Sequence, residues 1–338
     1  MAKFIYILIL IISAINLNAQ DIHYSQFDAT PLNINPALSG YFDGDYRIIG
    51  NHRTQWLSIT ENPYRTNSLS FDMKIKKNFS FNNLWFGAGV LLNTDKAGDG
   101  NFGTNQIKLS PAVHKIITQD SSLTVSLGFN IAFNQNSLDY NAFYFGNQWD
   151  GNKFNNQLPN NEFFSKDQFS YFDFSFGTIV KYIYHSLPVT IGLSLNHINQ
   201  PEKSFFDNQI SELKTKFTGF AQCNYQINSQ SSILPSIIYF DQGKYYEFDI
   251  GLLFKQQMND INFKSVYFGG WVRTRDAAIL KFAFDYKDFL IGISYDINLS
   301  KLRIASEGRG GIELSCIYIL NKPKKFYPTI RQQCPVFM

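Results

Sequence analysis

The chain has little of what most catalytic and metal sites require. Its 338 residues include only three cysteines, Cys223, Cys316 and Cys334. They are too few for a disulfide framework, and their spacing fits no metal site. The five histidines are dispersed, without the i, i+4 spacing of a helical zinc site, and no Gly-x-Ser-x-Gly nucleophile elbow occurs. We therefore expect no enzyme, with no catalytic residue, no metal and no cofactor.

Long apolar runs and strong charge are also scarce. One apolar run of 12 residues, Phe4 to Ile15, follows Met-Ala-Lys and precedes the small residue Ala19. It is shorter than the roughly 20 residues that a spanning helix needs. Residues 1–19 are therefore predicted to be a secretory signal peptide rather than a membrane anchor. A lipoprotein would need a cysteine at the cleavage site, and none lies there. The net charge of +3 gives no basis for a nucleic-acid partner.

Aromatic side chains, by contrast, are abundant, with 33 Phe and 19 Tyr. Rings favour strands and form girdles at the two interfaces of membrane barrels. From residue 44 onward, apolar residues alternate with small or polar ones. In Ser122–Phe133, Leu, Val, Phe and Ile occupy one face, and Thr, Ser, Gly, Asn and Ala occupy the other. Such period-two alternation predicts strands.

Alternation alone fits a soluble sandwich, with its apolar face toward a core, or a membrane barrel, with that face toward lipid. Ring-rich faces, long strands and the absence of edges in a closed sheet favour the barrel. We predict an all-β fold: a transmembrane antiparallel β-barrel of about 14 strands, in residues 44–319, as a single domain after the signal peptide. The expected strands are 44–54, 64–75, 82–93, 103–116, 121–133, 170–183, 187–198, 213–227, 231–241, 244–256, 264–273, 277–286, 289–297 and 309–319.

The connections suggest where partners bind. If the first strand leaves the periplasm, the odd-numbered connections are extracellular, and these include the two longest, 134–169 and 199–212. Their rings are candidate partner anchors, or they fold back on the rim. They are Phe143, Tyr144, Phe145, Trp149, Phe205 and Phe206. The expected periplasmic tail, 320–338, has basic residues that suit an acidic partner or face water. They are Lys322, Lys324 and Lys325.

Residues 20–43 show no alternation and contain the turn signals Asn35-Pro36 and Gly40. We expect a non-strand segment that tucks into or against the barrel lumen; the alternative is a disordered periplasmic leader. Glycines on the lumenal face would allow close backbone approach. They are Gly87, Gly89, Gly128, Gly192, Gly251 and Gly292.

Several stretches resemble one family. His23–Gly40, His-Tyr-Ser-Gln-Phe-Asp-Ala-Thr-Pro-Leu-Asn-Ile-Asn-Pro-Ala-Leu-Ser-Gly, is similar to the opening motif of the PorP/SprF family of the Bacteroidetes type IX secretion system. Further similar stretches are Tyr46–Trp56, Ser294–Leu302, Gly308–Ser315 and the Cys-Pro-x-Phe ending at Cys334–Phe337, here followed by an extra Met338. The residues that carry the resemblance are Asn35, Pro36, Gly40, Gln55, Trp56, Gly308, Gly310, Gly311, Cys334 and Pro335.

This resemblance implies an outer-membrane barrel of the type IX secretion and gliding machinery, which assists export or surface anchoring of a secreted adhesin. The implied partners are the adhesin's C-terminal domain, other type IX secretion or motor proteins and outer-membrane lipid. Two other functions remain open. A transporter of hydrophobic small molecules would need an apolar lumenal pocket, against which the small and acidic lumenal face argues. An outer-membrane enzyme would need a catalytic cluster.

Overall fold

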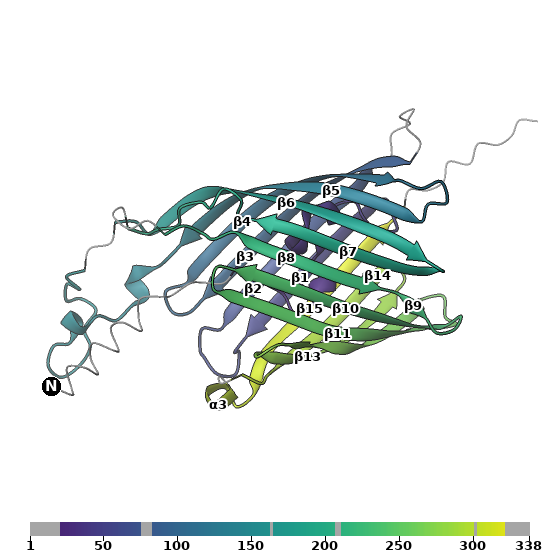
Figure 1. Ribbon diagram of the computed structural model, residues 1–338. Coiled ribbons are helices and arrows are strands. Elements are labelled where there is room, and N and C mark those ends of the chain that lie inside the picture. The colour runs from purple at the N-terminus through teal and green to yellow at the C-terminus, as the bar shows by residue number, and fades with distance from the viewer. Residues whose placement is uncertain (1–20, 76–82, 163–164, 207–210, 301–302, 322–338) are drawn as a thin grey trace, which may run out of the picture.

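The computed structural model describes residues 21–75, 83–162, 165–206, 211–300 and 303–321. The strands in this part of the chain pair into one antiparallel sheet (Figure 1). They are β1 (Tyr46–Gln55), β2 (Tyr64–Ile75), β3 (Leu84–Ala97), β4 (Phe102–Ile116), β5 (Leu123–Ser137), β6 (Gln168–Tyr184), β7 (Leu187–Asn196), β8 (Lys216–Cys223), β9 (Tyr225–Gln226), β10 (Ser231–Gln242), β11 (Tyr245–Gln257), β12 (Phe263–Arg273), β13 (Ala277–Tyr286), β14 (Phe289–Asn298) and β15 (Arg309–Leu320). The expected signal peptide and most of the expected tail lie outside the described residues.

The sheet closes on itself. Each strand pairs with its neighbours in the chain, and β1 pairs with β15 to complete the ring. The two-residue β9 continues β8, because both pair with β10 in one register: Gln222 lies opposite Ser236, and Tyr225 opposite Ile233. The interruption falls beside Pro235, which has no N–H for the ladder. Counting β8 and β9 as one gives 14 strands, which confirms the predicted all-β barrel.

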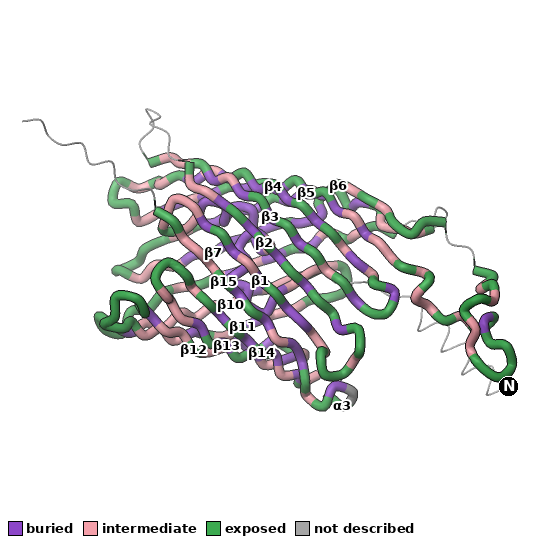
Figure 2. Tube along the Cα trace, turned by 180° about the vertical axis from the view of Figure 1, so that it is seen from behind, coloured by how far each residue is buried: buried purple, intermediate pink, exposed green. Residues whose placement is uncertain are grey.

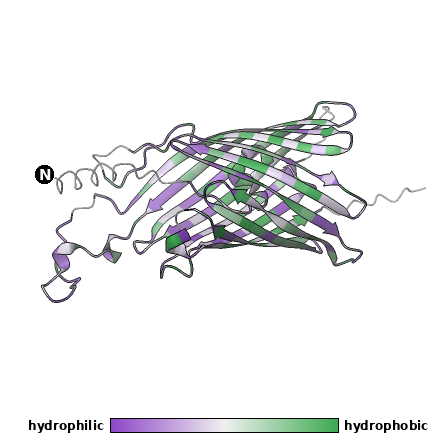
Figure 3. Ribbon diagram, turned by 60° about the horizontal axis from the view of Figure 1, so that its bottom comes forward, coloured by the Kyte–Doolittle hydropathy of each residue, from purple (hydrophilic) through white to green (hydrophobic). Residues whose placement is uncertain are grey.

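Polar residues are buried and apolar residues are exposed along the strands, which is the reverse of the pattern in a soluble protein. Along β5, the polar or small residues Ser126, Asn130 and Ala132 are buried, while Phe129 and Ile131 are exposed. Figure 2 shows buried and exposed positions alternating along the strands, and Figure 3 shows hydrophobic and hydrophilic residues alternating along them. The apolar face therefore points outward, as a lipid environment requires, and the polar face lines the lumen.

A segment that contains no strand passes through the lumen. We call residues 21–43 the plug. It contains three short helices, η1 (Phe27–Ala29), α2 (Pro31–Ile34) and η2 (Pro36–Leu38), which lie inside the barrel in Figure 1. Prolines at the start of α2 and η2 suit the first turn of a helix, where the missing N–H is not needed. No helix among the described residues is long and apolar enough to cross a membrane.

The two ends of the barrel differ in their connections. At one end, the loop end, the long connections 138–167 and 197–215 join β5 to β6 and β7 to β8. The first contains η3 (Tyr140–Ala142) and η4 (Gly146–Gln148), and α3 (Arg303–Ser306) lies in another connection at this end. At the opposite turn end, His185 and Ser186 alone join β6 to β7, both with positive φ. The long connection is shorter than the predicted 134–169, since β5 continues to Ser137 and β6 begins at Gln168.

Candidate functional site

The N-terminal part of the plug is held by a carboxylate on the last strand. The side chain of Glu313 accepts hydrogen bonds from the backbone N–H groups of Ser25, at 2.8 Å, and Gln26, at 3.0 Å. The Gln26 side chain donates to the Glu313 carbonyl oxygen at 2.9 Å and accepts from the Ser315 hydroxyl at 2.7 Å. All of these groups are buried, so Glu313 fixes the backbone of the plug directly. We call this contact the latch.

Two arginines of the wall surround the latch. Arg53 donates from Nη1 to the His23 carbonyl oxygen at 2.9 Å and pairs through Nη2 with Asp296 at 3.0 Å. Arg273 donates to the Ser25 hydroxyl at 3.2 Å, and that hydroxyl donates to Asp296 at 2.6 Å. Strands β1, β12, β14 and β15 thus converge on a few plug residues. Charged groups buried in this way are stable only when they are paired and hydrogen-bonded, which is the case here.

Ion pairs hold the plug at two further points. Lys281 of β13 contacts both carboxylate oxygens of Asp28, at 2.8 and 2.6 Å. At the loop end, Asp21 lies 3.4 Å from the Lys216 amine and 3.5 Å from the His197 ring, whose other nitrogen is 2.9 Å from Asp173.

These loop-end contacts shift two pKa values. Burial alone would lower the pKa of His197, but hydrogen bonds with Asp173 and Asp21 outweigh it and raise that pKa above its ordinary value. Burial alone would raise the pKa of Asp21, but Lys216 and His197 hold it well below its usual range. Both groups are therefore favoured in their charged forms, which attract each other.

The middle of the plug lies against glycines. The Asn35 side chain donates to the carbonyl oxygens of Thr178, at 3.1 Å, and Leu193, at 2.9 Å. A Cβ atom at Gly177 would collide with Asn35, and one at Gly128 would collide with the backbone of Pro36 and Ala37. Only glycine at these two wall positions lets the plug approach so closely.

Toward the turn end, β1 and β2 hold the end of the plug. Asp72 accepts from the Gly40 N–H at 2.8 Å and pairs with Arg47 at 2.7 Å. Arg47 also donates to the Leu38 carbonyl oxygen at 3.1 Å. Gly40 has φ of +68°, a conformation that favours glycine, and a Cβ there would meet Gly87. The plug therefore runs the length of the lumen, from Asp21 at the loop end to β1 at the turn end.

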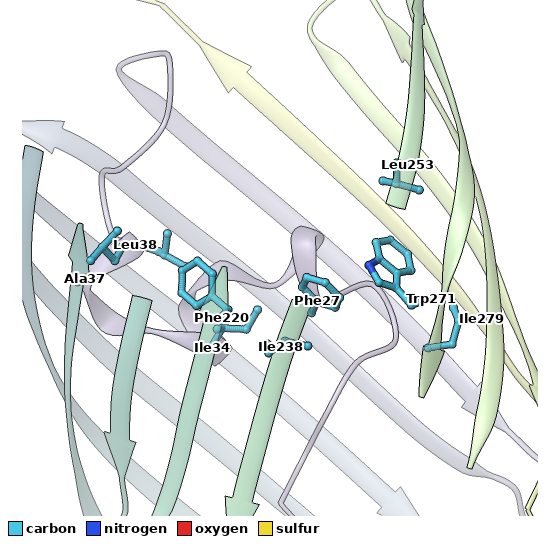
Figure 4. Packing of buried hydrophobic residues seen from close by; sticks show 10 residues of the cluster. Phe27, Ile34, Ala37, Leu38, Phe220, Ile238, Leu253, Trp271 and Ile279 are labelled. Carbon is cyan, nitrogen blue, oxygen red and sulfur yellow. The ribbon is translucent and has the colours of Figure 1, made fainter. Parts of the chain in front are cut away.

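On the other side of the lumen, the plug packs against apolar side chains. Figure 4 shows Phe27, Ile34, Ala37 and Leu38 of the plug facing residues of β8 and β10 to β13. The wall residues of this cluster are Ile179, Phe220, Ile238, Leu253, Trp271 and Ile279. The rings of Phe27 and Trp271 meet edge to face, with centroids 5.1 Å apart. This inner cluster is the only sizeable apolar core among the described residues, so the plug supplies the core that the barrel wall lacks.

A cavity of about 370 Å³ remains between the plug and this side of the wall, in the half nearer the turn end. Apolar or aromatic side chains form much of its lining. They include Tyr41, Leu234, Leu253, Tyr267, Trp271 and Leu290. The sequence suggested that the lumenal face was too small and acidic for such a pocket, and that expectation was wrong. Alternation identifies inward positions but not which of their apolar residues lie side by side across strands.

The structure separates the six predicted partner-binding rings into two groups. Phe205 packs into the rim, with its centroid 6.2 Å from Phe102 and 4.8 Å from Phe169. Phe143 and Phe145 are half-buried. Tyr144, Trp149 and Phe206 are 78%, 58% and 42% exposed. The first three rings thus support the loops, and the last three are exposed on the two long loops at the loop end; we refer to these three rings together as the exposed aromatic surface. Lys322, Lys324 and Lys325 lie outside the described residues.

The remaining motif residues lie at the loop end beside the latch. Gly311 pairs with Gln55 between β15 and β1, and the Trp56 N–H donates to the Gly310 carbonyl oxygen at 3.0 Å. Gly308 has φ of +78° in the turn before β15, and a Cβ at Gly310 would collide with the Asp296 carbonyl. These residues set the course of the strands that carry Glu313 and Asp296. Cys334 and Pro335 lie outside the described residues.

Sequence reasoning missed the residues that hold the plug. The sequence indicated only a small and acidic lumenal face, without a role for Glu313, Asp296 or Lys281, and it marked Asn35 as a turn former and motif residue. Their partners are backbone groups far away in the chain, and no local spacing reveals them. One sign was present: acids recur at inward positions of strands whose other inward residues are small. Within the described part of the chain, no three His, Cys, Asp or Glu side chains are placed to hold a metal ion.

Comparison with known proteins identifies the family. The model for the type IX secretion system membrane protein PorP/SprF matches residues 16–318, so the chain belongs to this family. It is an outer-membrane barrel of the type IX secretion system, as the resemblance implied, and membership implies that other components of that system are its partners. The matched stretch contains both the plug and the strands that form the latch.

Solved structures share the fold. The CymD monoaromatic hydrocarbon channel is 9% identical, with a TM-score of 0.51 over 87% of this chain and 93% of that one. A Pseudomonas aeruginosa FadL homologue is 8% identical, with a TM-score of 0.50 over 84% of this chain and 92% of that one. At such identities the likeness shows the barrel fold alone. No curated protein matches the chain.

Proposed function

We propose that the barrel assists export or surface anchoring of a secreted, adhesin-type protein by binding that protein's C-terminal domain at the loop end. The observation that carries this proposal is the exposed aromatic surface of Tyr144, Trp149 and Phe206 on the two longest loops. Aromatic residues are common anchors of protein interfaces, because each buries a large area at little cost in side-chain entropy.

The plug favours a role in binding another protein rather than a role as an open pore. It is fixed to β1, β2, β6, β7 and β12 to β15 along its length by buried hydrogen bonds and ion pairs. A lumen filled in this way leaves the loop end as the face that a large exported protein can meet. The expected basic tail, 320–338, offers a second contact for a periplasmic component of the same system.

The test is surface display in the native host. A strain lacking this gene should lose surface display of one or a few secreted proteins, while its permeability to small solutes stays nearly unchanged. Complementation with Tyr144→Ala/Trp149→Ala should restore barrel assembly but not display, since losing two interface anchors weakens binding by about tenfold each. Tyr246→Ala, which removes an exposed ring at the start of β11 at the same end, serves as the matched control. Normal display with the double variant would refute the role of this surface.

Uptake of hydrophobic small molecules is a second candidate, favoured by the apolar cavity. CymD, which has a similar fold, is a channel for monoaromatic hydrocarbons, and these are hydrophobic small molecules. A deletion strain that lost uptake of such a compound but kept its surface proteins would favour the transporter over the secretion role.

A further inference from the structure

The lumenal cavity has an apolar interior with few free polar groups. The Trp271 indole N–H donates to the Ser236 hydroxyl at 2.9 Å, and the Tyr267 hydroxyl donates to Asp285 at 2.8 Å. Lys281, which also lines the cavity, is neutralised by Asp28. Polar groups that are already hydrogen-bonded do not compete for a ligand, so rings and aliphatic side chains make up most of the surface that the cavity presents.

One lining cation is different. Lys181 of β6 lines the cavity near the turn end, and no ion pair with it is found among the described residues. An ammonium group on a half-buried lumenal position favours a negatively charged partner. The cavity volume of about 370 Å³ falls within the roughly 300–1,000 Å³ of small-molecule sites. Its chemistry is therefore that of an apolar chamber with one cation at the edge.

The cavity also reaches the barrel wall. Its lining includes Cys223 and Asn224, at the interruption between β8 and β9, and Pro235 on the facing strand β10. By strand alternation, Cys223 and Pro235 belong to the outward face, because Phe220 and Ile238 point inward. The same place lacks a ladder hydrogen bond, since Pro235 has no N–H. The cavity thus extends to outward-facing residues of the wall at this interruption.

We propose that this cavity binds a single alkyl chain that carries an anionic head, with the chain among Leu234, Leu253 and Trp271 and the head at Lys181. The site goes beyond the proposed secretion role, because it lies at the other end of the lumen from the aromatic surface. A fatty acid and a membrane lysophospholipid share this chemistry, and the experiment distinguishes them.

The experiment is equilibrium binding of radiolabelled dodecanoate to the purified full chain in amphipol, which avoids competing detergent. We expect saturable binding that unlabelled dodecanoate displaces, and about tenfold weaker displacement by methyl dodecanoate, which lacks the charge. Displacement by a dodecanoyl lysophosphatidylglycerol at lower concentration than by dodecanoate would identify the membrane lipid as the source. The reverse order would identify the free fatty acid. Absence of saturable binding overturns the proposal.

Variants locate the site. Ala283→Phe adds a ring into the cavity and should reduce affinity at least tenfold, while Ala278→Phe, on the outward face of the same strand, should not. If Ala283→Phe fails to form a heat-modifiable barrel, Leu234→Trp fills the same space. Equal binding by the filled and control variants would overturn the site.

The cation is tested separately. Lys181→Gln should weaken dodecanoate binding about tenfold and leave the methyl ester unchanged, whereas the exposed Lys115→Gln on β4 should change neither. An unchanged carboxylate affinity in Lys181→Gln would overturn the assignment of the head.

Discussion

Removing the Glu313 carboxylate should loosen the plug. This one side chain accepts two backbone hydrogen bonds, from Ser25 and Gln26, at 2.8 and 3.0 Å. Hydrogen bonds to a charged acceptor contribute about 1.5–3 kcal/mol each. In Glu313→Ala both N–H groups lose their acceptor, but water entering the lumen compensates in part, so we take the lower value for each. The latch should then weaken by about 3 kcal/mol, on the order of a hundredfold in the population of the open plug.

Thiol labelling measures that population. Thr30→Cys places a cysteine on the plug at a buried position, in a background in which the three native cysteines are serine. When opening is fast relative to labelling, the labelling rate follows the equilibrium between closed and open plug. We expect the rate to rise about a hundredfold in Glu313→Ala, and roughly tenfold in Glu313→Gln, which keeps one acceptor oxygen.

The control is Asp120→Ala, which removes an exposed acid in a connection at the turn end. It should leave the labelling rate of the Thr30 position unchanged. If Glu313→Ala labels at the parental rate, the carboxylate does not hold the plug, and the other contacts suffice without it.

Three further predictions test the orientation and the plug contacts. In cells, Asn152→Cys should react with an impermeant maleimide, and Ser229→Cys only after the outer membrane is permeabilised; the opposite result inverts the topology. Gly128→Ala should lower the yield of heat-modifiable barrel or raise plug labelling, because its Cβ collides with the plug backbone, while Gly50→Ala has open space and should match the parent. The raised pKa of His197 means that its contacts with the flanking carboxylates are strongest when it is protonated. Their stabilisation is present below pH 6.5 and is lost as pH rises through the raised pKa. Protease cleavage near the start of the plug should therefore increase at alkaline pH, relative to His197→Gln at each pH, and an equal pH response in both would contradict this.

The sequence predicted the strands well wherever the outer wall faces lipid. The structure bounds β2 and β13 at the predicted residues. The strands predicted from the sequence were too short at the loop end for β3 and β5, because β3 continues to Ala97 and β5 to Ser137. Beyond the lipid, outward residues such as Thr94 and Lys96 no longer need to be apolar, yet the hydrogen-bond ladder continues. Periodicity therefore follows the membrane boundary rather than the end of the strand.

The contacts of the plug were predicted only in outline. Gly87, Gly89 and Gly128 lie against it, whereas Gly192 faces the Phe220 ring and Gly251 faces the Gly270 carbonyl. The sequence did not predict the role of Gly177, where Asn35 occupies the space that a Cβ atom would need. A lumenal glycine permits close approach of whatever lies opposite, and the sequence does not state which residue that is. Three-dimensional register between the plug and the wall decides it.

The family motifs form the two halves of one interface. Positions 288 residues apart, Ser25 and Glu313, are in direct contact, and the wall side of this interface includes the charged side chains of Arg47, Arg53, Asp72 and Glu313. The plug side consists largely of backbone groups: the N–H groups of Ser25, Gln26 and Gly40 and the carbonyl oxygens of His23 and Leu38. Backbone groups are in place only when the plug has the right shape, which its prolines and the positive φ of Gly40 determine. The wall therefore recognises the conformation of the plug more than its side chains. This explains why a Pro- and Gly-containing stretch and distant acidic strands occur together in one chain.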